Sequence, residues 1–89
     1  MSIVQGSVVR AIAGKEKNQI FVVEKVDDKF CYIIDGKRLK LGKPKKKSLK
    51  HVQKALKIEF ETKKLESGQE KVNAEIRRFL KESVCLNKM

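Results

Sequence analysis

The stretch IFVVEKVDDKFCYIIDG, residues 20–36, decides the fold of this chain. It holds two runs rich in β-branched and aromatic residues, 20–26 and 30–34, and the short polar segment VDDK joins them. Such runs, separated by turn-forming residues, are typical of antiparallel strands. We therefore predict a β-hairpin at the centre of the fold.

The Asp35-Gly36 pair that ends this stretch predicts a second hairpin, because both residues suit the positive φ angles of a type I′ turn. The strand after that turn would cover 38–41. Before the central hairpin, 7–12 has the same β-branched character, and a further short run lies at 49–52. Short strands around a small core predict a mainly β fold, a partly open SH3-like barrel of about five strands followed by one or two short helices.

The loop AGKEKNQ, residues 13–19, has room for a backbone partner. Gly14 takes positive φ at no steric cost, and Asn18 tolerates the left-handed region better than most residues. In the functional interpretation, Lys15 and Lys17 reach phosphates while Gly14 lets a nucleic-acid backbone approach. The alternative is a loop that only closes a hairpin.

The hydrophobic period changes in the last third of the chain. Ile58, Thr62 and Leu65 are spaced i, i+4, i+7 ahead of Gly68, a suitable helix C-terminus. The segment IEFET also alternates as a strand does, and we favour the helix.

A second, better defined helix is predicted over about 74–83. One of its faces consists of Ile76, Phe79, Leu80 and Ser83. Asn73 is the expected N-cap. The chain thus divides into a barrel, 1–57, which contains a basic segment at 37–57, and a helical C-terminal extension, 58–89.

A chain of 89 residues supports one domain with a small core. Its two cysteines, Cys31 and Cys85, have no C-x-x-C spacing, so we interpret them as reduced thiols outside any disulfide framework. The N-terminus lacks the pattern of a signal peptide, and no apolar run approaches the ~18 residues of a membrane span. We therefore expect a cytoplasmic protein with no membrane partner.

Positive charge is concentrated in one segment. Residues 1–36 carry five basic and five acidic groups, 37–57 carry ten and none, and 58–89 carry seven and six, for a net charge of +11. Charge confined to one segment creates a local field that attracts a polyanion. Pro44 stiffens the segment into an extended approach, although a solvated, flexible lysine run is the plain alternative.

With these residues in view, the chain resembles KOW-domain RNA-binding proteins, bacterial relatives of a KOW-type large-subunit ribosomal protein of archaea and eukaryotes. The resemblance covers about residues 6–52, over half of the chain, and NAEIRRFLK also resembles the helical tail of those relatives. Its informative positions are Gly6, Val8, Val9, Ala13, Gly14, Lys15, Phe21, Val22, Val23, Asp35, Gly36, Lys50 and His51. Asn18 stands where the family usually has glycine. The resemblance implies an SH3-like barrel that binds RNA, in particular ribosomal RNA, as a ribosomal protein or as a ribosome-associated factor in assembly or translation.

We predict an RNA-binding surface made of the Gly14 loop and the basic segment. The candidate contacts are Gly14, Lys15, Lys17, Lys37, Arg38, Lys40, Lys43, Lys45, Lys46, Lys47, Lys50 and His51. Phosphate contacts would supply most of the affinity, so binding should weaken steeply as salt increases. Replacing Lys45, Lys46 and Lys47 with Gln is expected to weaken binding with little loss of fold. Tyr32 is the aromatic residue to test for base stacking, and the phenylalanines are assigned to the core.

No pattern of residues points to an enzyme. The serines lack a His/Asp partner pattern, no glycine motif cradles a phosphate, and His51 with two distant cysteines offers too few metal ligands. We expect no catalysis, no metal or other cofactor and no small-molecule substrate. Two other functions remain open: a protein-interaction module that binds acidic peptides, and a DNA-binding protein linked to the nucleoid or to transcription.

Overall fold

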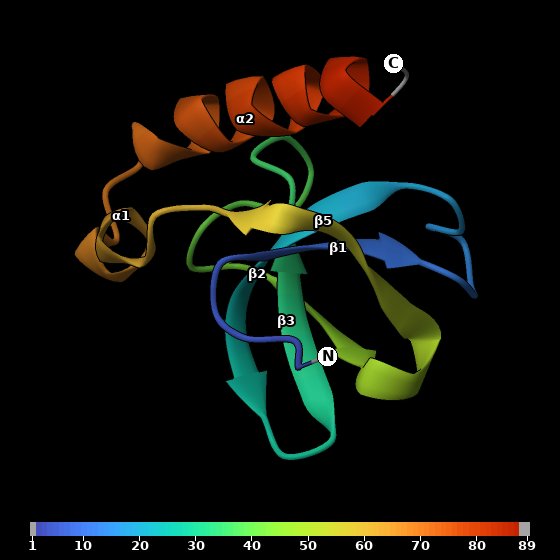
Figure 1. Ribbon diagram of the computed structural model, residues 1–89. Helices are drawn as coiled ribbons and strands as arrows, with labels where there is room; N and C mark the ends of the chain where they lie inside the picture. Colours follow the sequence, from blue (N-terminus) through green and yellow to red (C-terminus); the bar gives the residue numbers. More distant parts are fainter. Residues whose placement is uncertain (1, 88–89) are drawn as a thin grey trace.

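A computed structural model describes the backbone of residues 2–87 and the side chains of residues 2–83. A five-stranded antiparallel sheet is followed by two helices, which confirms the predicted mainly β fold. The elements are β1 (Ser7–Ala11), β2 (Ile20–Asp27), β3 (Phe30–Ile34), β4 (Lys45–Ser48), the 3₁₀ turn η1 (Leu49–His51), β5 (Val52–Glu59), α1 (Thr62–Ser67) and α2 (Val72–Asn87). The strand order β4-β3-β2-β1-β5 is compatible with a small, partly open SH3-like barrel (Figure 1).

Where the helices cover the sheet, both faces of the central strands are buried, which explains the apolar pairs in their sequences. Val8 and Val9, for example, point to opposite faces of the sheet, and both are fully buried. The barrel interior consists of Val9, Ala11, Phe21, Val23, Cys31, Ile33 and Val52. The core between sheet and helices consists of Val8, Val22, Ile34, Phe60, Leu65, Val72, Ile76 and Leu80. The helices therefore complete a second core on the outside of the barrel.

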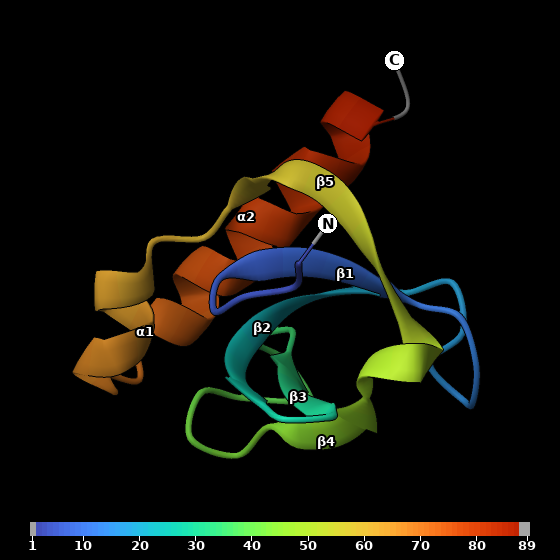
Figure 2. The ribbon, with the colours of Figure 1, turned by 60° about the horizontal axis from the view of Figure 1, so that its bottom comes forward.

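The second helix lies across this outer core, as Figures 1 and 2 show. Its predicted inner face is confirmed, because Ile76, Leu80 and Ser83 are buried. Phe79 is half-buried and meets Phe60 edge to face, with 5.2 Å between the ring centroids and 72° between the planes. Such aromatic contacts add to the stability gained from apolar burial.

The fourth strand lies later in the chain than predicted. The prediction of a strand at 38–41 was wrong, since β4 lies within the lysine run and pairs with β3. The predicted type I′ turn was also wrong, because Gly36 has positive φ, 80°, and Asp35 does not. The Asp35 carboxylate instead accepts hydrogen bonds at 2.8 and 3.0 Å from the amides two and four residues ahead. These bonds stabilise a wide loop in place of a tight hairpin.

The fifth strand also begins and ends later than predicted. The segment 49–51, predicted to open it, forms the turn η1, and β5 starts at Val52. The prediction of a helix from Ile58 was wrong, because β5 continues to Glu59. Ser7 of β1 lies opposite Glu59, so strand pairing satisfies the backbone groups that a helix would otherwise satisfy.

The end of α1 and the start of α2 lie near the predicted positions. Gly68 ends α1 in the left-handed conformation, φ 68°, as predicted. Because α2 already begins at Val72, Asn73 lies inside the helix and the prediction of an N-cap there was wrong. The Asn73 side chain accepts a hydrogen bond from the Leu41 amide at 2.7 Å and donates to the Glu70 carbonyl at 3.1 Å. Asn73 thus connects α2 to the loop before β4.

Candidate nucleic-acid interface

The basic segment 37–57 divides into paired and unpaired cations. Its ion pairs join Lys45 and Lys47 to Glu16, and Lys54 to Glu59. Seven others are exposed and have no carboxylate partner among the described residues: Lys37, Arg38, Lys40, Lys43, Lys46, Lys50 and Lys57. We call these seven the free cations, because they are the ones available to a polyanion.

Glu16 holds two lysines of β4 against the Gly14 loop. Lys45 Nζ donates to Glu16 Oε2 at 2.6 Å, while Lys47 Nζ donates to Glu16 Oε1 at 3.0 Å and to the Ala13 carbonyl at 2.9 Å. The hydrogen bond from Lys45, and to a smaller extent the one from Lys47, lowers the pKa of Glu16 to about 2. Only 9% of the Lys47 side chain is exposed. Lys47 therefore fixes the loop and is turned away from any phosphate outside.

The Gly14 loop has the left-handed positions that its sequence indicates. Gly14 and Asn18 have φ angles of 84° and 74°. A Cβ at Gly14 would lie 2.8 Å from the Lys47 amine, so glycine leaves space for the ion pair inside the loop. Lys15 and Lys17 are exposed on its surface. The structure thus gives Gly14 a structural role, and close approach of a nucleic-acid backbone stays a prediction.

The loop 35–44 displays four of the free cations from a fixed backbone. Arg77 of α2 donates to the Gly36 carbonyl at 2.5 Å, and the Asn73 side chain accepts a hydrogen bond from the Leu41 amide. The Gly42 amide donates to a carboxylate oxygen of β2 at 2.9 Å. Contacts from two elements therefore hold this loop in place, although it has no regular secondary structure over most of its length.

A further group of cations comes from α2, and the sequence-based prediction of the site missed it. An open hollow between α2 and the loop 35–44 is lined by Ile20, Asp35, Lys37, Arg77, Arg78, Leu80 and Lys81. Its one carboxylate, Asp35, already accepts two backbone hydrogen bonds. Finding this group from the sequence would have required knowing that Gly36 packs against α2.

The two predicted loops meet in a small crevice at the edge of the barrel. The crevice is lined by Glu16, Gln19, Phe21, Asp35, Arg38, Leu39 and Lys45. Arg38 therefore lies beside the Gly14 loop. Lys40 and Lys43 pair with each other through an isolated backbone bridge, next to the Gly42 contact with β2. We call the exposed cations of the loop 35–44, β4, η1 and the Gly14 loop the band.

Two aromatic rings lie on the outer face of the sheet. Phe30 is 37% exposed, so its assignment to the core was wrong. Tyr32 is half-buried and follows on the same side of β3. Lys46 Nζ lies 4.2 Å from the centroid of the Phe30 ring, and Lys25 Nζ lies 5.2 Å from the centroid of the Tyr32 ring. A face with this composition suits ligands that have both negative charge and aromatic rings.

The turn η1 carries two predicted site residues, Lys50 and His51, and both are exposed. The His51 carbonyl accepts a hydrogen bond from the Ile12 amide at 2.9 Å. This bond places η1 beside the Gly14 loop, so these predicted residues do lie near one another.

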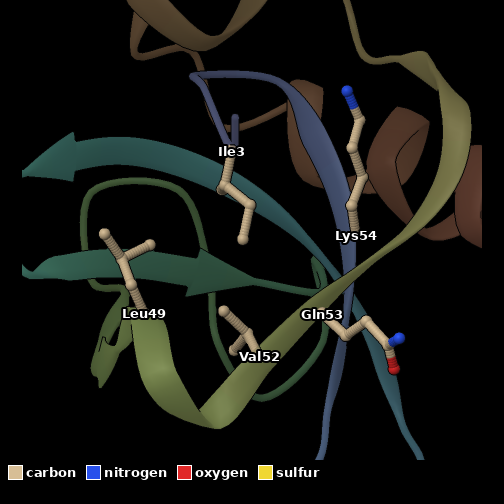
Figure 3. A pocket seen from close by; sticks show the side chains of 5 residues that line it. All are labelled: Ile3, Leu49, Val52, Gln53 and Lys54. Carbon is tan, nitrogen blue, oxygen red and sulfur yellow. The ribbon is translucent and has the colours of Figure 1, made fainter. Parts of the chain in front are cut away.

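The hollow beside η1, drawn in Figure 3, is lined mainly by aliphatic side chains. It is lined by Ile3, Leu49, Val52, Gln53 and Lys54. Figure 3 shows Lys54 extending its amine away from the three aliphatic side chains. This hollow offers an aliphatic surface and no set of groups suited to catalysis.

The described part of the chain offers few features that suit other kinds of site. Among the described residues, no group of three or more His, Cys, Asp or Glu side chains is arranged to hold a metal ion. None of the helices in that part of the chain is long and apolar enough to cross a membrane. Cys31 is a free thiol in the barrel core, and burial raises its pKa, which suppresses the reactive thiolate. The side chain of Cys85 lies outside the described residues.

Comparisons with known proteins do not identify a family. No protein-family model matches this chain, and no curated protein matches it. The resemblance to KOW-domain proteins therefore rests on the sequence positions given above and stays a proposal.

Proposed function

We propose that this protein binds RNA, in particular ribosomal RNA, as a ribosomal protein or a ribosome-associated assembly or translation factor. One observation carries the proposal: seven exposed cations in the segment 37–57 have no carboxylate partner among the described residues. The Gly14 loop and α2 add further exposed cations beside them. An ordered band of unneutralised positive charge is the electrostatic footprint of a nucleic-acid-binding protein.

The fixed backbone of the band supports binding beyond simple charge attraction. Most of the 35–44 loop is held by hydrogen bonds from α2 and β2, and the Glu16 ion pairs hold the Gly14 loop. A partner therefore meets a largely preorganised surface, and less ordering entropy is lost when the complex forms. Such a surface recognises the spacing of phosphates, which depends on the shape of a folded RNA.

Charge alone attracts DNA and RNA equally, so the choice of RNA needs separate support. That support comes from the resemblance to KOW-domain proteins, whose informative positions include the Gly14 loop and the end of the lysine run. An acidic peptide and duplex DNA are the competing partners, and a direct competition experiment distinguishes them from RNA.

The first test measures binding to a structured RNA by fluorescence anisotropy at increasing salt. The double variant Lys40→Gln/Lys43→Gln removes two free cations, and Lys63→Gln/Lys71→Gln removes two exposed lysines of the helical region as a matched control. Each lost phosphate contact reduces the slope of log affinity against log salt by roughly 0.7 to 0.9. We expect the first variant to lower that slope by roughly 1.4 to 1.8 and the control to leave it near the wild-type value. Equal slopes for both variants would contradict the proposed band, and stronger binding to duplex DNA would favour the DNA function.

The second test concerns the ribosome. Tagged protein from a cell lysate is sedimented through sucrose gradients at low and high salt, with and without ribonuclease. Co-migration with the large subunit that is lost after RNA digestion would support a role on ribosomal RNA. Protein that stays at the top of every low-salt gradient would refute the ribosomal part of the proposal.

A further inference from the structure

The outer face of β2, β3 and β4 carries a row of alternating cations and aromatic rings. The strand register places Lys25 opposite Tyr32, and Tyr32 opposite Lys46. Phe30 lies on the same face, because the intervening Cys31 points into the barrel and is fully buried. We call these four residues, Lys25, Phe30, Tyr32 and Lys46, the aromatic row. In Figure 2, β4 lies at the bottom of the view and α2 toward the top, so this end of the sheet is remote from the helix.

Each ring of the aromatic row has an ammonium group over it. The distances from Nζ to the ring centroid are 4.2 Å for Lys46 and Phe30, and 5.2 Å for Lys25 and Tyr32. Neither lysine forms an ion pair with a described carboxylate. Lysine side chains are flexible, and at exposed sites their attraction to a ring is weak. A ligand can therefore displace the ammonium groups from the rings without breaking an ion pair.

Building on the proposed RNA binding, we infer that the aromatic row stacks an unpaired base of the bound RNA on Tyr32, with Lys25 and Lys46 beside the neighbouring phosphates. Every base has a π-face, and aromatic rings flanked by cations are the combination with which proteins hold single-stranded nucleic acid. Lys46 is also one of the free cations, so the row continues the phosphate-binding band. An acidic peptide without rings would satisfy the lysines but would leave the ring faces unused.

An acidic residue opposite Phe30 favours Tyr32 as the stacking ring. Asp27 lies opposite Phe30 in the strand register and is exposed. Its carboxylate repels phosphates at that end of the face. The base is therefore expected on Tyr32, away from the Asp27 end of the face.

The chain contains one tyrosine and no tryptophan, so tyrosine emission reports Tyr32 alone. We would titrate the full-length protein with an RNA stem-loop, with the closed duplex of the same stem, and with inorganic polyphosphate. A free tyrosine amide titrated in parallel corrects for light absorbed by the RNA. Stacking on Tyr32 predicts strong quenching by the stem-loop, and much weaker quenching by the duplex and by polyphosphate, which lack unpaired bases.

Two variants at the same position separate ring stacking from other effects. Tyr32→Phe keeps the ring and Tyr32→Leu removes it, and circular dichroism checks that both variants remain folded. Anisotropy with labelled RNA should show stem-loop binding roughly 10-fold weaker for Tyr32→Leu, in line with the contribution of one stacked base. Binding by Tyr32→Phe should stay close to wild type, and all three proteins should bind the duplex alike.

The outcomes separate this inference from the proposed function. Stem-loop binding without quenching, unchanged in Tyr32→Leu, would overturn the stacking site while leaving phosphate binding intact. Equal losses of loop and duplex binding in Tyr32→Leu would show a structural effect and would also overturn it. Failure of the wild-type protein to bind any of the RNAs would refute the proposed function itself.

Discussion

Three neighbouring lysines, Lys45, Lys46 and Lys47, have different roles because side chains alternate along a strand. Lys46 is exposed on the outer face, whereas Lys45 and Lys47 reach Glu16 on the other side. The sequence shows only a uniform basic run, so it predicts that replacing all three leaves the fold intact. The ion pairs indicate instead that this triple replacement removes two contacts that fix the Gly14 loop.

Single substitutions at adjacent positions should therefore separate stability from binding. Lys47→Gln removes charged hydrogen bonds from a site where the side chain is 9% exposed, so we expect the free energy of unfolding to fall by about 2 kcal/mol. Lys46→Gln should change it by less than about 0.5 kcal/mol, because the residue is exposed, and should weaken RNA binding. Urea unfolding and anisotropy titrations measure the two effects. Equal stability of the two variants would contradict the structural role of Lys47.

The same ion pairs predict how stability depends on pH. Because the pKa of Glu16 falls from 4.5 to about 2 on folding, its charge stabilises the native state fully above pH 4.5. That stabilisation is lost as the pH falls from 4.5 toward 2, where the carboxyl becomes protonated in the folded protein as well. Glu16→Gln should therefore be less stable than wild type at pH 7, and the difference should shrink across this window in urea unfolding experiments. Glu66→Gln is the control, since Glu66 is exposed and forms no ion pair with the described residues. A difference that stays constant from pH 7 to pH 2 would contradict the assignment.

Among the elements, α2 and the loop 35–44 depend on one glycine. Gly36 has φ 80°, and a Cβ there would clash with the Asn73 carbonyl and lie 3.0 Å from the Arg77 side chain. Gly42, in the same loop, has φ 86° and no atom within 4 Å of such a Cβ. A side chain at either glycine would therefore carry the cost of a left-handed backbone conformation. Only at Gly36 would it also collide with α2.

This pair allows a matched test of helix docking. Gly42→Ala should destabilise the protein by about 1 to 2 kcal/mol, the cost of a side chain at positive φ. Gly36→Ala should cost more, because the added carbon also separates the loop from α2. The free energies of unfolding from urea titrations, compared between the two variants, isolate the docking contribution. Similar values for both would mean that the loop tolerates displacement from the helix.

The first three strands could be predicted from the sequence, because each is a local run of β-branched and aromatic residues between turn residues. Lys45–Ser48 could not, since three lysines and a serine have weak strand preference and form β4 only through pairing with β3 and the ion pairs to Glu16. The basic segment was likewise visible in the sequence. Which of its cations form ion pairs depends on residues that are distant in the chain. The proximity of Arg78 and Lys81 to Lys37 also depends on the fold, because these residues are far apart in the sequence.

At the scale of the whole molecule, the sheet is shared between two cores. Val8 packs against the helical core and Val9 lies in the barrel interior, and β2 and β3 contribute to both cores in the same way. The predicted barrel, 1–57, and the predicted helical extension, 58–89, therefore contribute to cores that share one sheet. A perturbation of the helical core should reach the barrel through the shared strands.

Ile76→Ala tests this coupling, because Ile76 is fully buried between α2 and the sheet. We expect a loss of about 2 to 5 kcal/mol in the free energy of unfolding, as for other large-to-small changes in a core. Ile58→Ala makes the same change at a residue that is 46% exposed, so its effect should be far smaller. Unfolding would be followed by far-ultraviolet circular dichroism, which reports the helices, and by the emission of Tyr32, which reports the sheet. If the two cores unfold together, both signals shift to the same lower urea midpoint in Ile76→Ala. A shift confined to the helical signal would show that the barrel is stable without the helices and would contradict the coupling.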